Sequence, residues 1–461
     1  MRWLALLAAA VAAAVLPYSR PGIGVPLVAA IVALTVASSV LRSARLPIFG
    51  GLALALACIP AWLDAPWIVA TDLVAACLLA TVAVAGVSVV APAAPLRALV
   101  DVGPLLPSGR AQWIPAARGA LIGSLLVVPF GTLFWSGDAA FAELGGSLPL
   151  PSLASAPGRV VVFLGVLVGA VGLALAERRP DPRTALRAIS RLTLWEWALP
   201  LVLLDLLFLA FVLVQATVLF GGHAHVLETA GLTYSEYARQ GFWQLIAAAS
   251  LTLAVVWTAL RVAVVRTRAE RLLLHGLVAC LCVLTLVVVA SAIRRLHLYE
   301  DAFGLTRARL AAETFSLSVG ALFVLVLLAG LVPAVRARFA AIAVAGAALG
   351  LLAFSLSNPD GRVAARNVER WRHTGRLDIP YLQGLSADAV PALAQLPEPL
   401  RASVLAPYRR RLAAGEPWSS ANRSRRNARA ILAAQSAPGV PGLNSLGIGT
   451  RTARGEARTQ A

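Results

Sequence analysis

The feature that most constrains this chain is a succession of apolar runs, most of them about 20 residues long, separated by short polar segments. A helix of that length crosses the hydrocarbon core of a bilayer, and it pairs its own backbone groups where no water is available. The alternation of apolar and polar residues that a membrane barrel needs is absent. The chain is therefore predicted to be all-α, a polytopic transmembrane helical bundle of eleven spans. They are residues 3–17, 22–40, 46–62, 66–90, 114–135, 158–176, 195–220, 242–263, 272–293, 310–332 and 338–356.

The basic residues narrow the range of functions. All 40 of them are arginine and none is lysine, which excludes chemistry that requires a lysine, such as a Schiff base or a P-loop. The formal net charge of +18 would favour nucleic acid as the partner of a soluble protein. Here the arginines gather in short loops and in the C-terminal segment, where membrane topology and anionic lipids explain them. Membrane lipids are therefore the expected partners, and neither nucleic acid nor a cofactor is expected.

The same arginines predict the orientation. Segments 178–191 and 261–271 are rich in arginine, and short loops of that kind stay in the cytoplasm. With eleven spans, the N-terminus is then cytoplasmic and the C-terminal segment extracytoplasmic, in a multi-pass protein of the bacterial cell membrane. The first span follows Arg2 and ends in small residues before Pro17, which is also the pattern of a cleaved signal peptide, and that alternative stays open.

The character of the chain changes after residue 357. Residues 1–357 are predicted to form the bundle, residues 358–435 a helical module, and residues 436–461 a disordered tail rich in Gly, Ser, Pro and Arg. The first helix of the module is expected to end at Gly375, and Ser386 to cap a short helix. Segments 398–412 and 420–435 resemble amphipathic basic helices that lie on anionic lipid headgroups.

One polar stretch interrupts the apolar chain between the ninth and tenth spans. It reads RRLHLYEDAFGLTRARL over residues 294–310. Gly304 is expected to end the first helix and Thr306 to cap the next. One interpretation is a helical hairpin locked by ion pairs, in which Glu300 and Asp301 reach the arginines beyond the turn.

A second interpretation makes this stretch a binding site. Arginine pairs well with a phosphate, and arginine with tyrosine suits a lipid phosphate or a sugar. The candidate ligand-binding residues are Arg295, Tyr299, Glu300 and Arg307.

Acidic groups inside predicted spans are costly, so each is a hypothesis about function. Asp205 lies deep in the seventh span, with Glu196 near one end and Gln215 near the other. These three residues are candidates for a proton or cation path. The alternative is a buried acid paired with an arginine or a helix end. Asp72 and Glu313 also lie within spans.

No metal site with standard ligand spacing is predicted. The segment HAHVLE brings His223, His225 and Glu228 close together, which makes them weak candidates. The cysteines all fall within predicted spans and are expected to be packing residues: Cys58, Cys77, Cys280 and Cys282.

Three G-x-x-x-G pairs are expected to let helices approach closely. They are Gly119/Gly123, Gly165/Gly169 and Gly346/Gly350.

Four motifs occur in a fixed order along the chain: LTYSEYARQGF, RLHLYEDAFGLTRARL, NPDGRVAARNVER and LDIPYLQGLSADAVPAL. In this order, over roughly residues 110 to 430, the chain resembles a bacterial membrane family known only as domain of unknown function forty-one seventy-three. The resemblance implies a polytopic helical membrane protein, and the Arg and Ala bias suits an actinobacterium. It implies no activity and no catalytic residue.

Three functions are compatible with these features. The first is a non-enzymatic envelope sensor or assembly component, favoured because polar residues cluster without a nucleophile and its base. The second is a proton- or cation-coupled transporter that uses Asp205. The third is an envelope enzyme that acts on lipid-linked substrates through Arg295, Tyr299 and Glu300.

Overall fold

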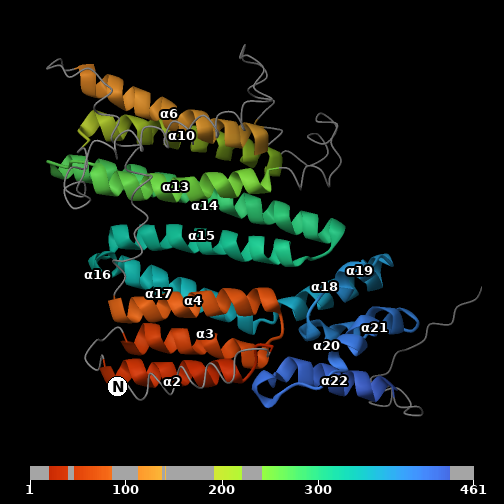
Figure 1. The fold of residues 1–461 in the computed structure, drawn as a ribbon. Helices are drawn as coiled ribbons and strands as arrows, with labels where there is room; N and C mark the ends of the chain where they lie inside the picture. The colour runs from red at the N-terminus through yellow and green to blue at the C-terminus, as the bar shows by residue number, and fades with distance from the viewer. Residues whose placement is uncertain are drawn as a thin grey trace, which may run out of the picture.

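The computed structural model describes residues 20–39, 46–85, 113–137, 141, 192–220 and 241–436. Within these ranges the chain is an all-α helical membrane bundle followed by a smaller group of helices, as predicted (Figure 1). Every predicted span that falls in these ranges coincides with a helix. The predicted spans 3–17 and 158–176 lie outside the described residues, so the total of eleven stays a prediction.

The helices of the bundle, with their bounds, are α2 (Gly24–Ser39), α3 (Gly51–Trp62, preceded by the π-helix η1, Leu46–Gly50), α4 (Pro66–Ala85), α6 (Trp113–Gly137), α10 (Leu194–Phe220), α13 (Phe242–Val262), α14 (Arg268–Phe303), α15 (Arg307–Leu331), α16 (Pro333–Ala337) and α17 (Phe339–Leu356). By length and composition, six of those described are able to cross a membrane: α6, α10, α13, α14, α15 and α17. Helices α2, α3 and α4 are also apolar, over stretches shorter than 18 residues.

The bundle consists of two groups of helices joined by α17. One hydrophobic core is formed by α6, α10, α13, α14 and α15, and it includes stacked phenylalanines such as Phe134 and Phe211. A second core is formed by α3, α4 and α17. Helix α17 therefore packs against the first helices of the chain on one side and α15 on the other, so that segments far apart in sequence lie side by side (Figure 1).

Helix α14 is longer than the hydrocarbon core of a bilayer is thick. It has 36 residues, which at 1.5 Å per residue is about 54 Å, against a hydrocarbon core of about 30 Å. Thr267 and Glu270 form a capping box at its start. Gly304 ends it with φ +82°, in the region that favours glycine, and Thr306 caps α15 by accepting from the Arg309 N–H. The predicted helix end and cap are thus both confirmed.

The C-terminal helices pack at the end of the bundle where α14 ends and α15 begins (Figure 1). They are α18 (Pro359–Thr374), α19 (Ile379–Gln383), η4 (Ala387–Ala389), α20 (Val390–Leu393), α21 (Leu400–Leu412), η5 (Trp418–Ser420) and α22 (Arg423–Ser436). We refer to residues 359–436 as the module. Its hydrophobic core also contains Leu305 and Leu310 from the α14–α15 hairpin. The predicted boundary at residue 357 stays a prediction.

Two predicted helix ends in the module have different outcomes. Gly375 ends α18 in the left-handed conformation, with φ +67° and ψ 0°, as expected. Ser386 precedes η4 but does not cap it, because its hydroxyl donates to the carboxylate of Asp388 at 2.7 Å.

The glycine pairs differ in what they contact. A Cβ at Gly119 would lie 2.2 Å from the backbone oxygen of Trp195, and one at Gly123 would lie 2.7 Å from Leu203. This pair therefore brings α6 against α10, as predicted. A Cβ at Gly346 or Gly350 would meet no atom of the described residues within 4 Å, so this pair makes no close helix contact within the described part of the chain. The pair Gly165/Gly169 lies outside the described residues.

This contrast gives a direct test of packing. Gly119→Ala places a methyl group against backbone that cannot move aside easily, and we expect a loss of about 1–3 kcal/mol in the free energy of unfolding. Gly346→Ala is expected to be neutral or slightly stabilising, because alanine is the better helix former. The thermal midpoints of the two full-length variants in the same detergent measure the difference. Equal midpoints would contradict the close contact of α6 with α10.

Candidate functional site

The carboxylate of Asp360 lies at the junction of the bundle and the module and is fully buried. Arg307, the first residue of α15, donates to it through Nε at 2.7 Å and also through Nη2. The indole Nε1 of Trp67 on α4 donates to it at 3.1 Å, and the N–H of Ser386 at 2.8 Å. One carboxylate therefore joins two bundle helices to two segments of the module.

The local sequence around Asp360 explains its placement. Asn358 adopts a left-handed conformation with φ +53°, and its side chain accepts from the N–H of Gly361. Pro359 then starts α18, at a position where a missing N–H is harmless. Asp360 thus lies in the first turn of α18, where the positive end of the helix dipole stabilises a carboxylate.

Arg307 and Asp360 form an ion pair, and each also contacts another residue of the module. Burial would raise the pKa of Asp360, but the hydrogen bonds and charge of Arg307 and the donation from Ser386 outweigh it, so the pKa lies below its ordinary value. The backbone N–H of Arg307 donates to the hydroxyl of Tyr381 at 2.7 Å. Burial raises the pKa of Tyr381, so this phenol stays protonated at neutral pH.

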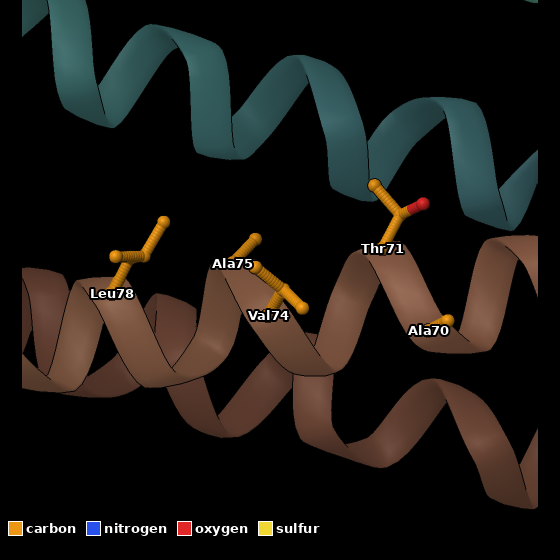
Figure 2. A pocket seen from close by; sticks show the side chains of 5 residues that line it. All are labelled: Ala70, Thr71, Val74, Ala75 and Leu78. Carbon is orange, nitrogen blue, oxygen red and sulfur yellow. The ribbon is translucent and has the colours of Figure 1, made fainter.

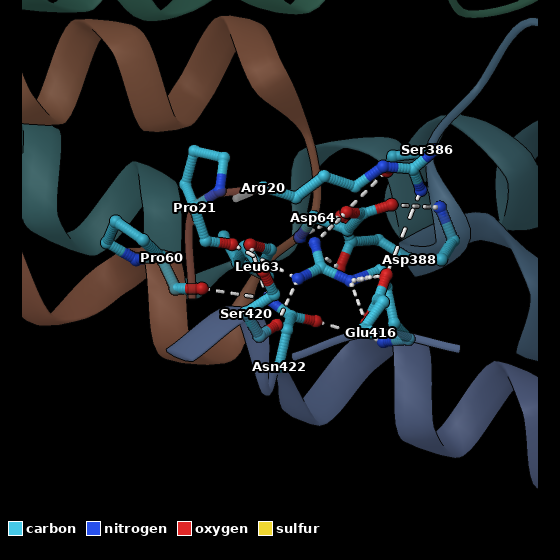
Figure 3. Close-up of polar contacts among 12 residues, drawn as sticks. Arg20, Pro21, Pro60, Leu63, Asp64, Ser386, Asp388, Glu416, Ser420 and Asn422 are labelled. Carbon is cyan, nitrogen blue, oxygen red and sulfur yellow. Dashed lines mark hydrogen bonds and ion pairs between the residues drawn. The ribbon is translucent and has the colours of Figure 1, made fainter. Parts of the chain in front are cut away.

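A second buried charge, Arg425 on α22, joins the module to residues near the start of the described chain. Figure 3 shows residues of this group, among them Asp64, Glu416 and Pro21. The guanidinium of Arg425 pairs with Asp64, which lies between α3 and α4, and with Glu416. It also donates to the backbone oxygens of Pro21 and Ser420. A buried guanidinium is tolerated only when its donors find acceptors, and here they do so on both the bundle and the module.

The acid Asp388 completes this anchor from the side of the module. It accepts from the backbone N–H of Asp64 at 2.9 Å and from the hydroxyl of Ser386 at 2.7 Å. Burial raises the pKa of Asp388, and the hydrogen bonds it accepts only partly offset that effect. The side-chain amide of Asn422 adds two hydrogen bonds, at 2.8 and 2.9 Å, to backbone oxygens at the end of α3 and just beyond it.

The four predicted ligand-binding residues differ in their contacts among the described residues. Arg295 is buried and donates to the side-chain oxygen of Gln215 at 3.1 Å. Arg307 instead points to Asp360. The ring of Tyr299 lies beneath the guanidinium of Arg309, 4.1 Å away. The ligand-binding interpretation stays a prediction, and its residues have different partners.

The predicted ion pairs of the hairpin lock are wrong. Within the described part of the chain neither Glu300 nor Asp301 pairs with an arginine. Arg309 folds onto Tyr299 and donates to the backbone oxygen of Gly304. The two helices are joined instead by His297 and Glu313, with Nε2 and Oε1 2.9 Å apart.

The candidates for an ion path also separate. The carboxylate of Glu196 accepts from the N–H and the hydroxyl of Thr193, both at 2.8 Å, and so caps the start of α10. Gln215 accepts from Arg295 and from Ser291. Asp205 is 7% exposed, and neither carboxylate oxygen has a hydrogen-bond donor among the described residues. The ion path through these three residues stays a prediction, and Asp205 is the member of the set without such a donor.

Two other acids within spans have polar partners. Asp72 on α4 accepts from the hydroxyl of Ser355 on α17 at 2.9 Å, which supports the contact between these helices. Glu313 pairs with His297, as described above. The weak metal candidates His223, His225 and Glu228 lie outside the described residues.

The residues that line an apolar groove on α4 include no acid, base or metal ligand that a catalytic site would need (Figure 2). They are Ala70, Thr71, Val74, Ala75 and Leu78. The hydroxyl of Thr71 donates to the backbone oxygen of Trp67, so it is occupied within its own helix. A groove of this kind on an apolar helix suits a lipid chain, and we assign it no reaction.

The match to a known family covers most of the chain. The model of a family described as Domain of unknown function (DUF4153) matches residues 5–396. The chain belongs to the DUF4153 family. This DUF4153 protein matches no curated protein and no solved structure.

The family suggested by the four motifs is therefore wrong, since the match is to DUF4153 and not to the family numbered forty-one seventy-three. The three motifs that fall within the described residues include helix ends and turns, where Gly, Pro and aromatic residues are common in polytopic proteins. Their order indicates a membrane layout and cannot distinguish two families. The match also begins at residue 5, well before the first motif.

Neither Asp360 nor Arg425 of this DUF4153 protein is among the residues predicted from sequence. The sequence nevertheless contains a pattern that could have identified each of them. An acid in N-P-D-G at a helix start is positioned to accept hydrogen bonds. Arg425 lies three and seven residues before Ala428 and Leu432, which are buried, so this arginine shares the apolar face of α22.

The two buried acids should respond differently to loss of charge. The depressed pKa of Asp360 means that its ionised form stabilises the fold above about pH 3.9, a contribution lost as pH falls through the lower folded pKa. The raised pKa of Asp388 has the opposite effect on stability, because ionisation of this group disfavours the folded state. We expect Asp360→Asn to cost about 3 kcal/mol at neutral pH and Asp388→Asn about 1 kcal/mol or less.

Thermal unfolding of both full-length variants in detergent at pH 7 measures this difference. A larger loss in Asp388→Asn than in Asp360→Asn would contradict the assignment of Asp360 as the charge that holds the module.

Proposed function

We propose that this protein is a non-enzymatic component of the bacterial cell envelope, a sensor or assembly component in which the module and the bundle act as one unit. The single observation that supports this most directly is the carboxylate of Asp360, which binds Arg307 and Trp67 of the bundle and Ser386 of the module. A partner or ligand that moves the module would change these contacts, and the hairpin and α4 would respond.

The polar residues at the junction also favour a non-enzymatic role. Arg295, Tyr299 and Glu300, which an envelope enzyme would use on lipid-linked substrates, have separate partners or none. The hydrogen bonds around Asp360 and Arg425 connect segments of the bundle to segments of the module, so these polar groups hold the two parts together. Function then depends on the coupling between bundle and module.

The module is proposed to face the outside of the cell membrane. The arginine-rich segment 261–271 lies at the opposite end of the bundle from the module, and arginine-rich short loops favour the cytoplasm. Arg410, Arg423 and Arg426 are exposed on the module, which suits contact with anionic lipid headgroups.

The orientation is testable with a cysteine at each of two exposed positions. Ala430 is exposed on α22, and Ala334 is exposed on α16 at the other end of the bundle. We expect a membrane-impermeant maleimide to label Ala430→Cys on intact cells and to label Ala334→Cys only after permeabilisation. The unaltered chain is the control, because its native cysteines lie within spans. The reverse pattern would put the module in the cytoplasm.

A second candidate function is a proton- or cation-coupled transporter. The observation that favours it is Asp205, a buried acid whose oxygens have no hydrogen-bond donor among the described residues. Acids of this kind inside membranes mark ion pathways. Glu196 and Gln215, however, are engaged in local hydrogen bonds, so a continuous path along α10 has less support than coupling through Asp360.

Complementation of a deletion strain distinguishes the two functions. Asp360→Asn and Arg307→Gln break the coupling, and we expect both to grow like the deletion strain under osmotic and detergent stress. Asp205→Asn should grow like wild type, with the amount of each variant in the membrane matched by immunoblot. Growth with Asp360→Asn and failure with Asp205→Asn would refute the sensor or assembly role and favour transport.

A further inference from the structure

We propose that His297, Glu300 and Glu313 bind one divalent transition-metal ion of the zinc class at the end of the α14–α15 hairpin. His297 and Glu300 are three residues apart on α14, so their side chains share one face. Glu313 lies on α15, which runs antiparallel beside α14. The site is thus built from both helices of the hairpin.

The distances suit a single ion. One ligand atom from each of the three residues lies within 4.8 Å of the others, and the imidazole Nε2 lies 2.9 Å from Oε1 of Glu313. Zinc bonds to nitrogen and oxygen are about 2.0–2.1 Å, which places the ligands of a tetrahedral site about 3.3 Å apart. Small rotations of the two glutamates bring the three atoms to that spacing.

The negative charges of Glu300 and Glu313 favour a bound cation. Two carboxylates lie close together, and within the described residues neither forms an ion pair with an arginine. Oxygen Oε1 of Glu300 is buried and accepts no hydrogen bond there, which is costly for a carboxylate. Arg309 is close, but its guanidinium donates to the backbone of Gly304 and lies over Tyr299. A divalent ion would neutralise both glutamates and give the buried oxygen a partner.

The ligand types select the class of metal. An imidazole with two carboxylates suits zinc and its neighbours, whereas magnesium and calcium prefer sites made of oxygen alone. The side chain of His297 is 50% exposed, so water or a small ligand can reach a fourth position on the ion. The ion would join α14 to α15 just before the turn that carries Arg307. The site stands independently of the proposed function.

The test is zinc binding by the full-length protein, purified in detergent without a polyhistidine tag and freed of metal with a chelator. Zn²⁺ alone is titrated against a chromophoric zinc indicator. We expect one zinc ion per chain. His297→Gln, Glu300→Gln and Glu313→Gln should each lower the affinity at least about tenfold, because each removes a direct ligand.

Two controls locate the ion. His373 forms a similar exposed pair with Glu369, at 3.1 Å and without a third ligand, so His373→Gln should bind zinc like wild type. The double variant His223→Gln/His225→Gln should also bind normally. Loss of zinc in either control with retention in His297→Gln would overturn the proposal, as would a wild-type protein that binds no zinc.

A measurement on the unaltered chain covers variants that fail to fold. Zn²⁺ should raise the thermal midpoint of the wild-type protein, since an ion that binds only the folded state stabilises it. Mg²⁺ at the same concentration should not. The same increase with both ions, or with neither, would refute a zinc-class site.

Discussion

The buried carboxylate of Asp360 is the interaction on which the arrangement of this protein depends. A charge without solvent is stable only if hydrogen bonds and an opposite charge compensate it. Arg307, Trp67 and Ser386 provide that compensation from three separate parts of the chain. The hairpin, α4 and the module must therefore be in register with one another for the carboxylate to remain buried. This requirement couples bundle and module more strictly than apolar contact alone, which tolerates sliding.

Arg425 is likewise a buried charge whose partners come from both the bundle and the module. Arg425 draws Asp64 and the backbone before α2 toward α22, so the first helices of the chain are held by its last described helix. Helix α17 adds a third long-range link, because it packs on α3 and α4. The first helices are therefore bound to the rest of the bundle largely through the C-terminal third of the chain. Among the described residues, the ion pairs of Arg307 and Arg425 therefore lie at the end of the bundle where the module packs.

Local signals in the sequence predicted local structure well. Apolar runs gave the described spans, and Gly304 and Thr306 gave the hairpin turn, because these features act within a few residues. Contacts between distant segments were less predictable. Gly119 and Gly346 occur in identical G-x-x-x-G patterns, yet within the described residues Gly119 meets a neighbouring helix and Gly346 does not, since the pattern permits an approach without choosing the partner. The predicted family was wrong for a related reason: short motifs of this kind occur in many membrane proteins and do not distinguish one family from another.

The polar stretch at residues 294–310 shows what sequence reasoning could and could not give for the candidate site. Its residues were recognised as unusual, but their tasks depend on partners that the sequence does not reveal. Arg295 is bound by Gln215 from α10, and Arg307 by Asp360 from α18. The spacing of His297 and Glu300 puts two members of the metal cluster on one face of α14, but Glu313 comes from the antiparallel helix α15, so the set of three is complete only in the fold. A short stretch between two spans thus contacts α10 of the bundle, α18 of the module and the facing helix of its own hairpin.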